Sequence, residues 1–261
     1  MEDISKELRK DILLLSHKCK DGNLQSAFSC VDILWVLYSR IMNWSASDPL
    51  ADDRDIFIIS KGQATLALFP VLCRSGLFTM EEVSSQIGHF DARFCNQVDV
   101  TKFSGGIENS AGSLGHGLPF ATGVAMANKI RGIDSTTYVL CGDGEFTEGT
   151  MWESCILAGT HKLDNLCVII DDNDSVSAMV NMGSMKDKLE AFDFDVYEVD
   201  GHDLTAVENA LKYVRRSKPV AIIAHTFRGY GSKTMADNDI WFHKAPNADE
   251  LEMLCREVDA F

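Results

Sequence analysis

The chain alternates between short apolar runs and longer stretches in which apolar positions recur every three or four residues. From Ile4 to Leu15 this spacing predicts a helix over 4–18 with one buried face. The same reasoning predicts helices at 29–43, 63–74, 117–131, 148–161, 204–215 and 247–258, and strands at 55–60, 137–141, 166–170, 195–199 and 220–224. Apolar strands that alternate with helices predict an α/β fold with a doubly wound, mainly parallel sheet and helices on both faces.

Polar stretches follow three of the predicted strands, at 60–63, 142–149 and 171–177, and the first two contain glycine. Ligands of open parallel sheets bind beyond the carboxyl ends of the strands, so these stretches form the candidate site. No linker-like composition and no internal repeat divides the chain, and we expect 1–261 to form a single domain. Asn247, followed three residues later by Glu250, is typical of a capping box and predicts the start of the last helix.

Composition restricts the class of ligand. Hydrophobic residues make up 46% of the 261 residues and charged residues 24%, as in ordinary globular proteins. The net charge of −15 disfavours nucleic acid and anionic membranes as partners, because both require fields of lysine and arginine. An acidic chain can still bind a pyrophosphate group when a cation and backbone N–H groups supply local positive charge. Such a ligand would therefore need a metal ion.

The eight cysteines indicate the compartment. They are scattered, with no Cys-x-x-Cys pair, and several lie inside apolar runs, which is typical of buried thiols in a reducing cytosol. The first residues are acidic and lack the apolar stretch of a signal peptide, and no run approaches the length of a membrane span. We expect a cytoplasmic protein.

The strongest candidate site lies in one predicted strand–helix–strand unit. The strand that ends at Cys141 runs into Gly142-Asp143-Gly144-Glu145, and the next strand runs into Asp171-Asp172-Asn173. Neighbouring parallel strands lie about 4.8 Å apart, so both loops can reach one ion. Their carboxylate and amide oxygens suit a hard cation such as Mg²⁺. By itself, Gly-Asp-Gly is equally compatible with a simple turn at the end of a strand.

The stretch GDGEFTEGTMWESCILAGTHKLDNLCVIIDDN, from Gly142 to Asn173, resembles the thiamine diphosphate motif of the transketolase family. Four further segments resemble motifs of that family in the same order: Ser60-Lys-Gly-Gln-Ala64, Gly112-Ser-Leu-Gly-His-Gly117, Asp200-Gly-His-Asp203, and Lys218-Pro219 through Arg228-Gly-Tyr-Gly231. The resemblance covers nearly the whole chain and implies the diphosphate-binding (PP) domain of the thiamine diphosphate-binding fold.

The resemblance also implies the site residues. Asp143, Asn173 and the backbone carbonyl of Ser175 would hold Mg²⁺, or Ca²⁺ or Mn²⁺ in its place, together with oxygens of thiamine diphosphate. A backbone amide of Gly144 or Glu145 would hold a diphosphate oxygen. The other positions that the resemblance assigns to the cofactor are Gln63, Ser113, Leu114, Gly115, Gly142 and His243.

Histidines are where the chain departs from the family. Gln63 and Asn23 stand where the family has histidine, and neither can carry charge or move a proton near neutral pH. Of the remaining histidines, His89 matches a substrate-facing Gly-His-Pro motif and His116 begins a predicted helix, so His89, His116 and Gln63 are the candidate catalytic residues. His243 matches a histidine close to the diphosphate, with Phe242 as the alternative at that position.

The expected reaction follows from the family and from the length of the chain. Members are more than twice as long and carry a second domain that activates the coenzyme's pyrimidine ring. The resemblance therefore implies a separately encoded, C-terminal transketolase-like (pyrimidine-binding) subunit, in an α2β2 assembly. It implies transfer of a two-carbon ketol unit from a ketose to an aldehyde. The altered histidines leave acyl transfer from pyruvate or another 2-oxo acid as an alternative, and a non-catalytic binding partner as a second.

Overall fold

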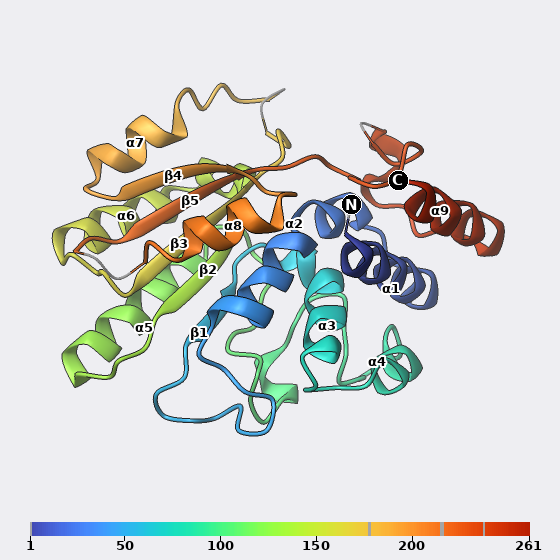
Figure 1. The fold of residues 1–261 in the computed structure, drawn as a ribbon, viewed down its shortest axis with the longest axis horizontal. Coiled ribbons are helices and arrows are strands. Elements are labelled where there is room, and N and C mark those ends of the chain that lie inside the picture. The colour runs from blue at the N-terminus through green and yellow to red at the C-terminus, as the bar shows by residue number, and fades with distance from the viewer. Residues whose placement is uncertain (1, 177–178, 215–216, 237) are drawn as a thin grey trace.

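The structure is a computed structural model that describes residues 2–176, 179–214, 217–236 and 238–261. The last residue of the predicted loop 171–177 and the last residue of the predicted helix 204–215 lie outside the described residues. Within them, five strands form one parallel sheet in the order β1-β2-β3-β5-β4 (Figure 1). They are β1 (Ile56–Ile59), β2 (Thr137–Gly142), β3 (Leu166–Asp172), β4 (Asp195–Asp200) and β5 (Val220–His225). The predicted parallel sheet is confirmed.

Helices cover both faces of the sheet, as predicted (Figure 1). One layer contains α1 (Asp3–Cys19), α2 (Leu24–Val36), α3 (Thr65–Arg74), α4 (Met80–Gln86), α8 (Leu204–Leu211) and α9 (Ala248–Ala260). The opposite layer contains α5 (Gly117–Arg131), α6 (Gly149–Thr160) and α7 (Met185–Ala191). Strands β1, β2, β3 and β5 are apolar because both layers bury them, whereas β4 forms an edge with a partly exposed pattern.

Most element boundaries agree with those predicted from the periodicity, and two of the helices differ at their ends. The predicted helix over 29–43 begins earlier, at Leu24, and its last turn, Leu37–Ile41, is a π-helix. The predicted helix over 63–74 is preceded by a 3₁₀ turn, Gly62–Ala64. Helix α5 has the predicted bounds and ends at Gly132, whose φ of 68° is left-handed and suits glycine. The predicted capping box of Asn247 and Glu250 opens α9.

The strand register brings the polar loops together. Gly142 of β2 pairs with Asp171 of β3, so the residues that follow both strands leave the sheet side by side. Ser60, which follows β1, donates its backbone N–H to Leu140 of β2 at 2.9 Å. The three polar loops therefore meet at the carboxyl ends of the strands, where parallel sheets bind ligands. None of the helices in the described ranges is long and apolar enough for a membrane span.

Candidate functional site

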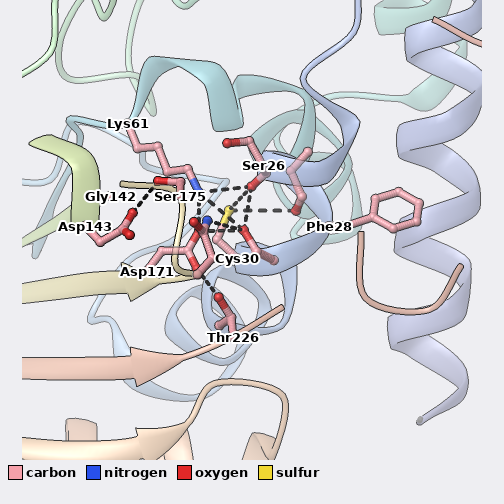
Figure 2. A network of polar contacts seen from close by, with 12 residues as sticks. Ser26, Phe28, Cys30, Lys61, Gly142, Asp143, Asp171, Ser175 and Thr226 are labelled. Atoms are coloured by element: carbon pink, nitrogen blue, oxygen red, sulfur yellow. Dashed lines mark hydrogen bonds and ion pairs between the residues drawn. The ribbon is translucent and has the colours of Figure 1, made fainter. Parts of the chain in front are cut away.

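Asp143 and Ser175 face each other across the ends of β2 and β3 (Figure 2). Ser175 Oγ donates to Asp143 Oδ1 at 2.5 Å, and the backbone N–H of Val176 donates to Asp143 Oδ2 at 3.4 Å. Asp143 and Asn173 are each only 5% exposed. The structure thus gathers the three residues assigned to a metal at the point where the two loops leave the sheet.

The side chain of Asn173 fits a cation ligand. Its Nδ2 donates to Ser29 Oγ at 3.3 Å and to Asp171 Oδ2 at 3.2 Å. Its Oδ1 is buried and accepts no hydrogen bond from any residue that the structure describes. Buried carbonyl oxygens are nearly always paired, so an orphaned one beside a carboxylate suits a bound cation. The described residues contain no cluster of three or more His, Cys, Asp and Glu side chains around a metal position, and this site would use an amide and a backbone carbonyl instead.

The glycines of the Gly-Asp-Gly turn leave the backbone open. A Cβ on Gly142 would lie 3.5 Å from Lys61 Cδ, and one on Gly144 would lie 3.6 Å from Ser175 Oγ. These are ordinary contacts, so the protein's own atoms do not require glycine at either position. The backbone at both glycines is therefore open to close approach by a ligand.

Glu145 ties three loops together. Its Oε1 accepts from Ser60 Oγ at 2.7 Å and from the Gly115 N–H at 2.9 Å, and its Oε2 accepts from the Gly142 N–H at 3.0 Å. Burial raises the pKa of Glu145, and these hydrogen bonds oppose the rise. Glu145 lies in the first turn of a 3₁₀ helix, Asp143–Thr147, that precedes α6. Its side chain holds the site together, while its backbone amide remains a candidate diphosphate contact.

The loop before α5 forms the next part of the site. Gly115 has a φ of 78°, and a Cβ there would lie 2.6 Å from the Cβ of Glu148, so only glycine fits. Ser113 and His116 line a cavity of about 510 Å³, and His116 Nδ1 lies 3.0 Å from the carbonyl oxygen of Leu114. The exposed His116 is therefore accessible from this cavity.

Gln63 lies beside the same loop. It belongs to the 3₁₀ turn Gly62–Ala64, and a Cβ on Gly62 would lie 3.1 Å from the backbone nitrogen of Gly112. Gln63 Oε1 is buried and has no hydrogen-bond partner within the described ranges. Like the Oδ1 of Asn173, it is an amide oxygen without a partner near the carboxyl ends of the strands. It lies next to a loop assigned to the cofactor.

The structure brings Asn23 and His243 together. Asn23 adopts a left-handed φ of 59° and donates its N–H to the carbonyl of Phe242 at 3.2 Å. A Cβ on Gly22 would lie 2.2 Å from the carbonyl carbon of His243, so the two segments touch through their backbones. Both Phe242 and His243 are exposed, and the alternative between them stays open.

The side chain of His89 makes no hydrogen bond or ion pair with the residues that the structure describes. It is exposed, its backbone N–H donates to the carbonyl of Gln86, and Gly88 lies against Cys19 at the end of α1. Instead, Gln97 contacts the loop before α5: its Oε1 lies 3.0 Å from where a Cβ on Gly112 would be. Sequence reasoning missed Gln97 because no motif marks the segment that contains it.

The Asp200-Gly-His-Asp203 motif makes structural contacts. His202 Nδ1 lies 3.0 Å from Asp32 Oδ2, and His202 Nε2 accepts the Phe227 N–H at 3.1 Å. The second contact places the ring hydrogen on Nδ1, which donates to Asp32. The ring also stacks on Tyr230, with ring centroids 3.6 Å apart. The motif anchors the segment after β5 to α2.

His225 lies beside a second cavity of about 480 Å³ that Asp143 also lines. His225 Nδ1 is 2.9 Å from Asp172 Oδ2, and its Nε2 is 3.5 Å from Glu198 Oε1. Burial raises the pKa of Asp172, and the charge of His225 opposes that rise.

Comparisons with known proteins agree with this geometry. Residues 6–258 match the family described as "Transketolase, thiamine diphosphate binding domain". The chain is 34% identical to one of the subunits of apulose-4-phosphate transketolase from Phocaeicola vulgatus, over 97% of this chain and 92% of that protein. It is also 34% identical to the protein of the same name from Actinobacillus succinogenes, over 99% and 95%. The transketolase structure from Campylobacter jejuni superposes with a TM-score of 0.88 at 29% identity, covering 100% of this chain and 43% of that one.

Proposed function

Because this chain belongs to the transketolase family, as its thiamine diphosphate-binding domain, we propose that it is the diphosphate- and metal-holding subunit of a two-component transketolase. Residues 1–261 would form that single domain. Two observations support this division: relatives named as transketolase subunits are matched over more than nine-tenths of their length, whereas the chain spans 43% of a solved transketolase.

The observation that carries this proposal is the orphaned Oδ1 of Asn173, two residues before Ser175, which itself donates a hydrogen bond to Asp143. Asp143, Asn173 and the carbonyl of Ser175 would hold a divalent cation, and a backbone amide of Gly144 or Glu145 would hold a diphosphate oxygen. When bound, thiamine diphosphate supplies the nucleophilic carbon and the electron sink for breaking and forming C–C bonds. The residues of this chain bind and orient it, and the cation offsets the negative charge of both protein and diphosphate.

The reaction we propose is transfer of a ketol unit from a ketose to an aldehyde acceptor. The relatives named for apulose 4-phosphate favour a ketose phosphate as donor. Asn23, Gln63 and Gln97 would recognise hydroxyl or carbonyl oxygens through neutral carboxamides, since such groups both donate and accept hydrogen bonds. Gln63 and His116 lie beside the loop before α5, where they can contact substrate, and His89 remains a third candidate.

The partner we propose is a pyrimidine-binding subunit, in an α2β2 assembly. Of the small residues of α5, Ala121 and Ala125 are buried in the core. The exposed side of α5 carries Phe120 at 48% exposure and Ile130 at 80%. Helix α6 adds Ile156 and Leu157, each about half exposed, and we place a contact with the partner on this apolar face. All eight cysteines are free thiols, which supports a cytoplasmic location.

The test is to find the gene for a separate pyrimidine-binding, transketolase-like subunit in the same genome, to coexpress it with this chain, and to add thiamine diphosphate and Mg²⁺. We expect ketose phosphates to donate to aldehydes only when both subunits are present. Activity with pyruvate or other 2-oxo acids, and none with ketoses, would replace ketol transfer by acyl transfer. A complex that binds the coenzyme but turns over neither class of donor would contradict an enzymatic role.

A further inference from the structure

A buried ion pair contacts Asn173, one of the residues assigned to the metal, and Figure 2 labels both members of the pair, Lys61 and Asp171. Lys61 Nζ pairs with Asp171 Oδ2, and the two side chains are 6% and 0% exposed. Ser29 Oγ of α2 donates to the same oxygen at 2.6 Å, and Thr226 Oγ1, after β5, donates to Asp171 Oδ1. Asp171 is therefore fixed by groups from three other segments of the fold.

This carboxylate determines which way the amide of Asn173 points. An ionised carboxylate only accepts hydrogen bonds, so the Asn173 atom that faces Asp171 Oδ2 must be Nδ2. Ser29 Oγ lies 3.3 Å from the same Nδ2. Rotating the amide by 180° would set Oδ1 against the carboxylate and lose both hydrogen bonds. The orphaned Oδ1 consequently has only one direction, away from Asp171.

We propose that Asp171 is a positioning residue for the metal site, an inference that rests on the proposed function. It turns the carbonyl oxygen of Asn173 toward the cation without coordinating the ion itself. Lys61 neutralises Asp171 and occupies one of its oxygens, which keeps this carboxylate out of the metal shell. Ser29 and Thr226 hold the pair in place, so helix α2 and the segment after β5 both contribute to metal affinity.

The experiment is Mn²⁺ binding to the full-length chain with saturating thiamine diphosphate, followed by electron paramagnetic resonance. In Asp171→Asn the neighbour of Asn173 can present either an oxygen or an NH₂ group, and the amide loses its fixed direction. We expect Mn²⁺ to bind roughly 10- to 100-fold more weakly, the usual cost of losing a partner that orients a metal ligand. The spectrum of the bound ion is expected to change as well, which a purely structural role would not cause.

Asp172→Asn is the matched control. Asp172 is the next residue of β3, and its substitution removes the same charge without touching Asn173, because its carboxylate faces His225. We expect a change of no more than about fivefold in Mn²⁺ affinity, the scale of a partly exposed charge interaction. An equal loss in both variants would mean that charge alone acts, and would overturn the proposal.

Two further variants distinguish a loss of the Asn173 amide orientation from other effects of substituting Asp171. Asp171→Asn with Lys61→Met removes the stranded lysine charge; recovery of wild-type affinity in this double variant would also overturn the proposal. If the Asp171 variants do not fold, the Ser29→Ala variant tests the proposal instead. It keeps the ion pair between Lys61 and Asp171 and removes one hydrogen-bond acceptor of the Asn173 amide. We expect about twofold to tenfold weaker Mn²⁺ binding, and unchanged affinity would contradict the inference. A wild-type chain that binds no Mn²⁺ would instead refute the proposed function.

Discussion

Helix α2 contributes to two buried charged networks that differ in one respect: Asp32 belongs to the first and Ser29 to the second. In the first network, Arg9 and Asp32 form an ion pair with side chains 0% and 1% exposed. All five N–H groups of Arg9 are used: three donate to the carbonyls of Ser5, Phe28 and Tyr230, and two donate to the carboxylate of Asp32. This network is closed, because every donor of the cation has a protein acceptor.

In the second network, Lys61 and Asp171 form an ion pair that is buried to a similar extent. Burial alone would lower the pKa of Lys61, but the charge of Asp171 outweighs it and the pKa lies above its ordinary value. This network is open: it leads through Asn173 to an amide oxygen that none of the described residues satisfies. We infer that the closed network holds the fold, whereas the open one prepares a position for a ligand.

The largest effect is expected on the closed side. Arg9→Met leaves Asp32 buried without its cation, and breaking such a pair costs about 3–5 kcal/mol of unfolding free energy. Denaturant unfolding of the chain measures this loss. Thiamine diphosphate affinity of the protein that remains folded is expected to stay within the error of wild type. A variant that unfolds normally but loses the coenzyme would reverse the roles of the two networks.

A comparable effect, in a different quantity, is expected on the open side. Asp143→Ala removes a proposed metal ligand, and we expect metal-dependent thiamine diphosphate binding to weaken by about 100-fold or more, which corresponds to roughly 2.7 kcal/mol. Unfolding of the protein without ligand is expected to change by less than about 1 kcal/mol, the worth of the hydrogen bond to Ser175. Calorimetric titration with and without Mg²⁺ measures the first, and chemical unfolding the second.

Acid is expected to weaken the closed network selectively. Burial alone would raise the pKa of Asp32, but Arg9 and the hydrogen bond from His202 hold the pKa well below its usual range. A depressed carboxyl pKa stabilises the fold above the unfolded-state pKa of about 3.9 and loses this contribution as the pH falls below it. Unfolding free energy is expected to fall by up to about 1.4 kcal/mol per pH unit from this group. In Arg9→Met this slope should be shallower, and an unchanged slope would exclude Asp32 as its source.

The smallest effect is expected for a neutral helix-cap hydrogen bond that lies outside both networks. Asn247→Ala removes the side-chain acceptor for the Glu250 N–H at the start of α9, and we expect a loss of about 1 kcal/mol in unfolding free energy. Asn247→Asp keeps the cap and serves as the control. If Asn247→Ala lost as much unfolding free energy as Arg9→Met, removing the cation of a buried ion pair would cost no more than removing a helix cap.

The fold could be predicted from the sequence because its strands are apolar on both faces and its helices have clear periodicity. The short helices α4 and α7 were not predicted, since seven residues carry little periodicity. The candidate site depends on motifs whose residues are close in sequence, such as Gly142 to Glu145. The pairing of Lys61 with Asp171 escaped prediction because it joins positions 110 residues apart, and only the sheet register brings them together.

Coenzyme binding, as proposed here, depends on Asp143, Asn173 and Ser175 holding the ion that binds the diphosphate. An anomalous difference map from crystals of the chain grown with Mn²⁺ and thiamine diphosphate would locate that ion. We expect a peak about 2.0–2.4 Å from an oxygen of each residue, with diphosphate oxygens completing the shell. Ordered coenzyme with the Mn²⁺ peak elsewhere, or with the oxygen of Asn173 turned away from the ion, would contradict this assignment.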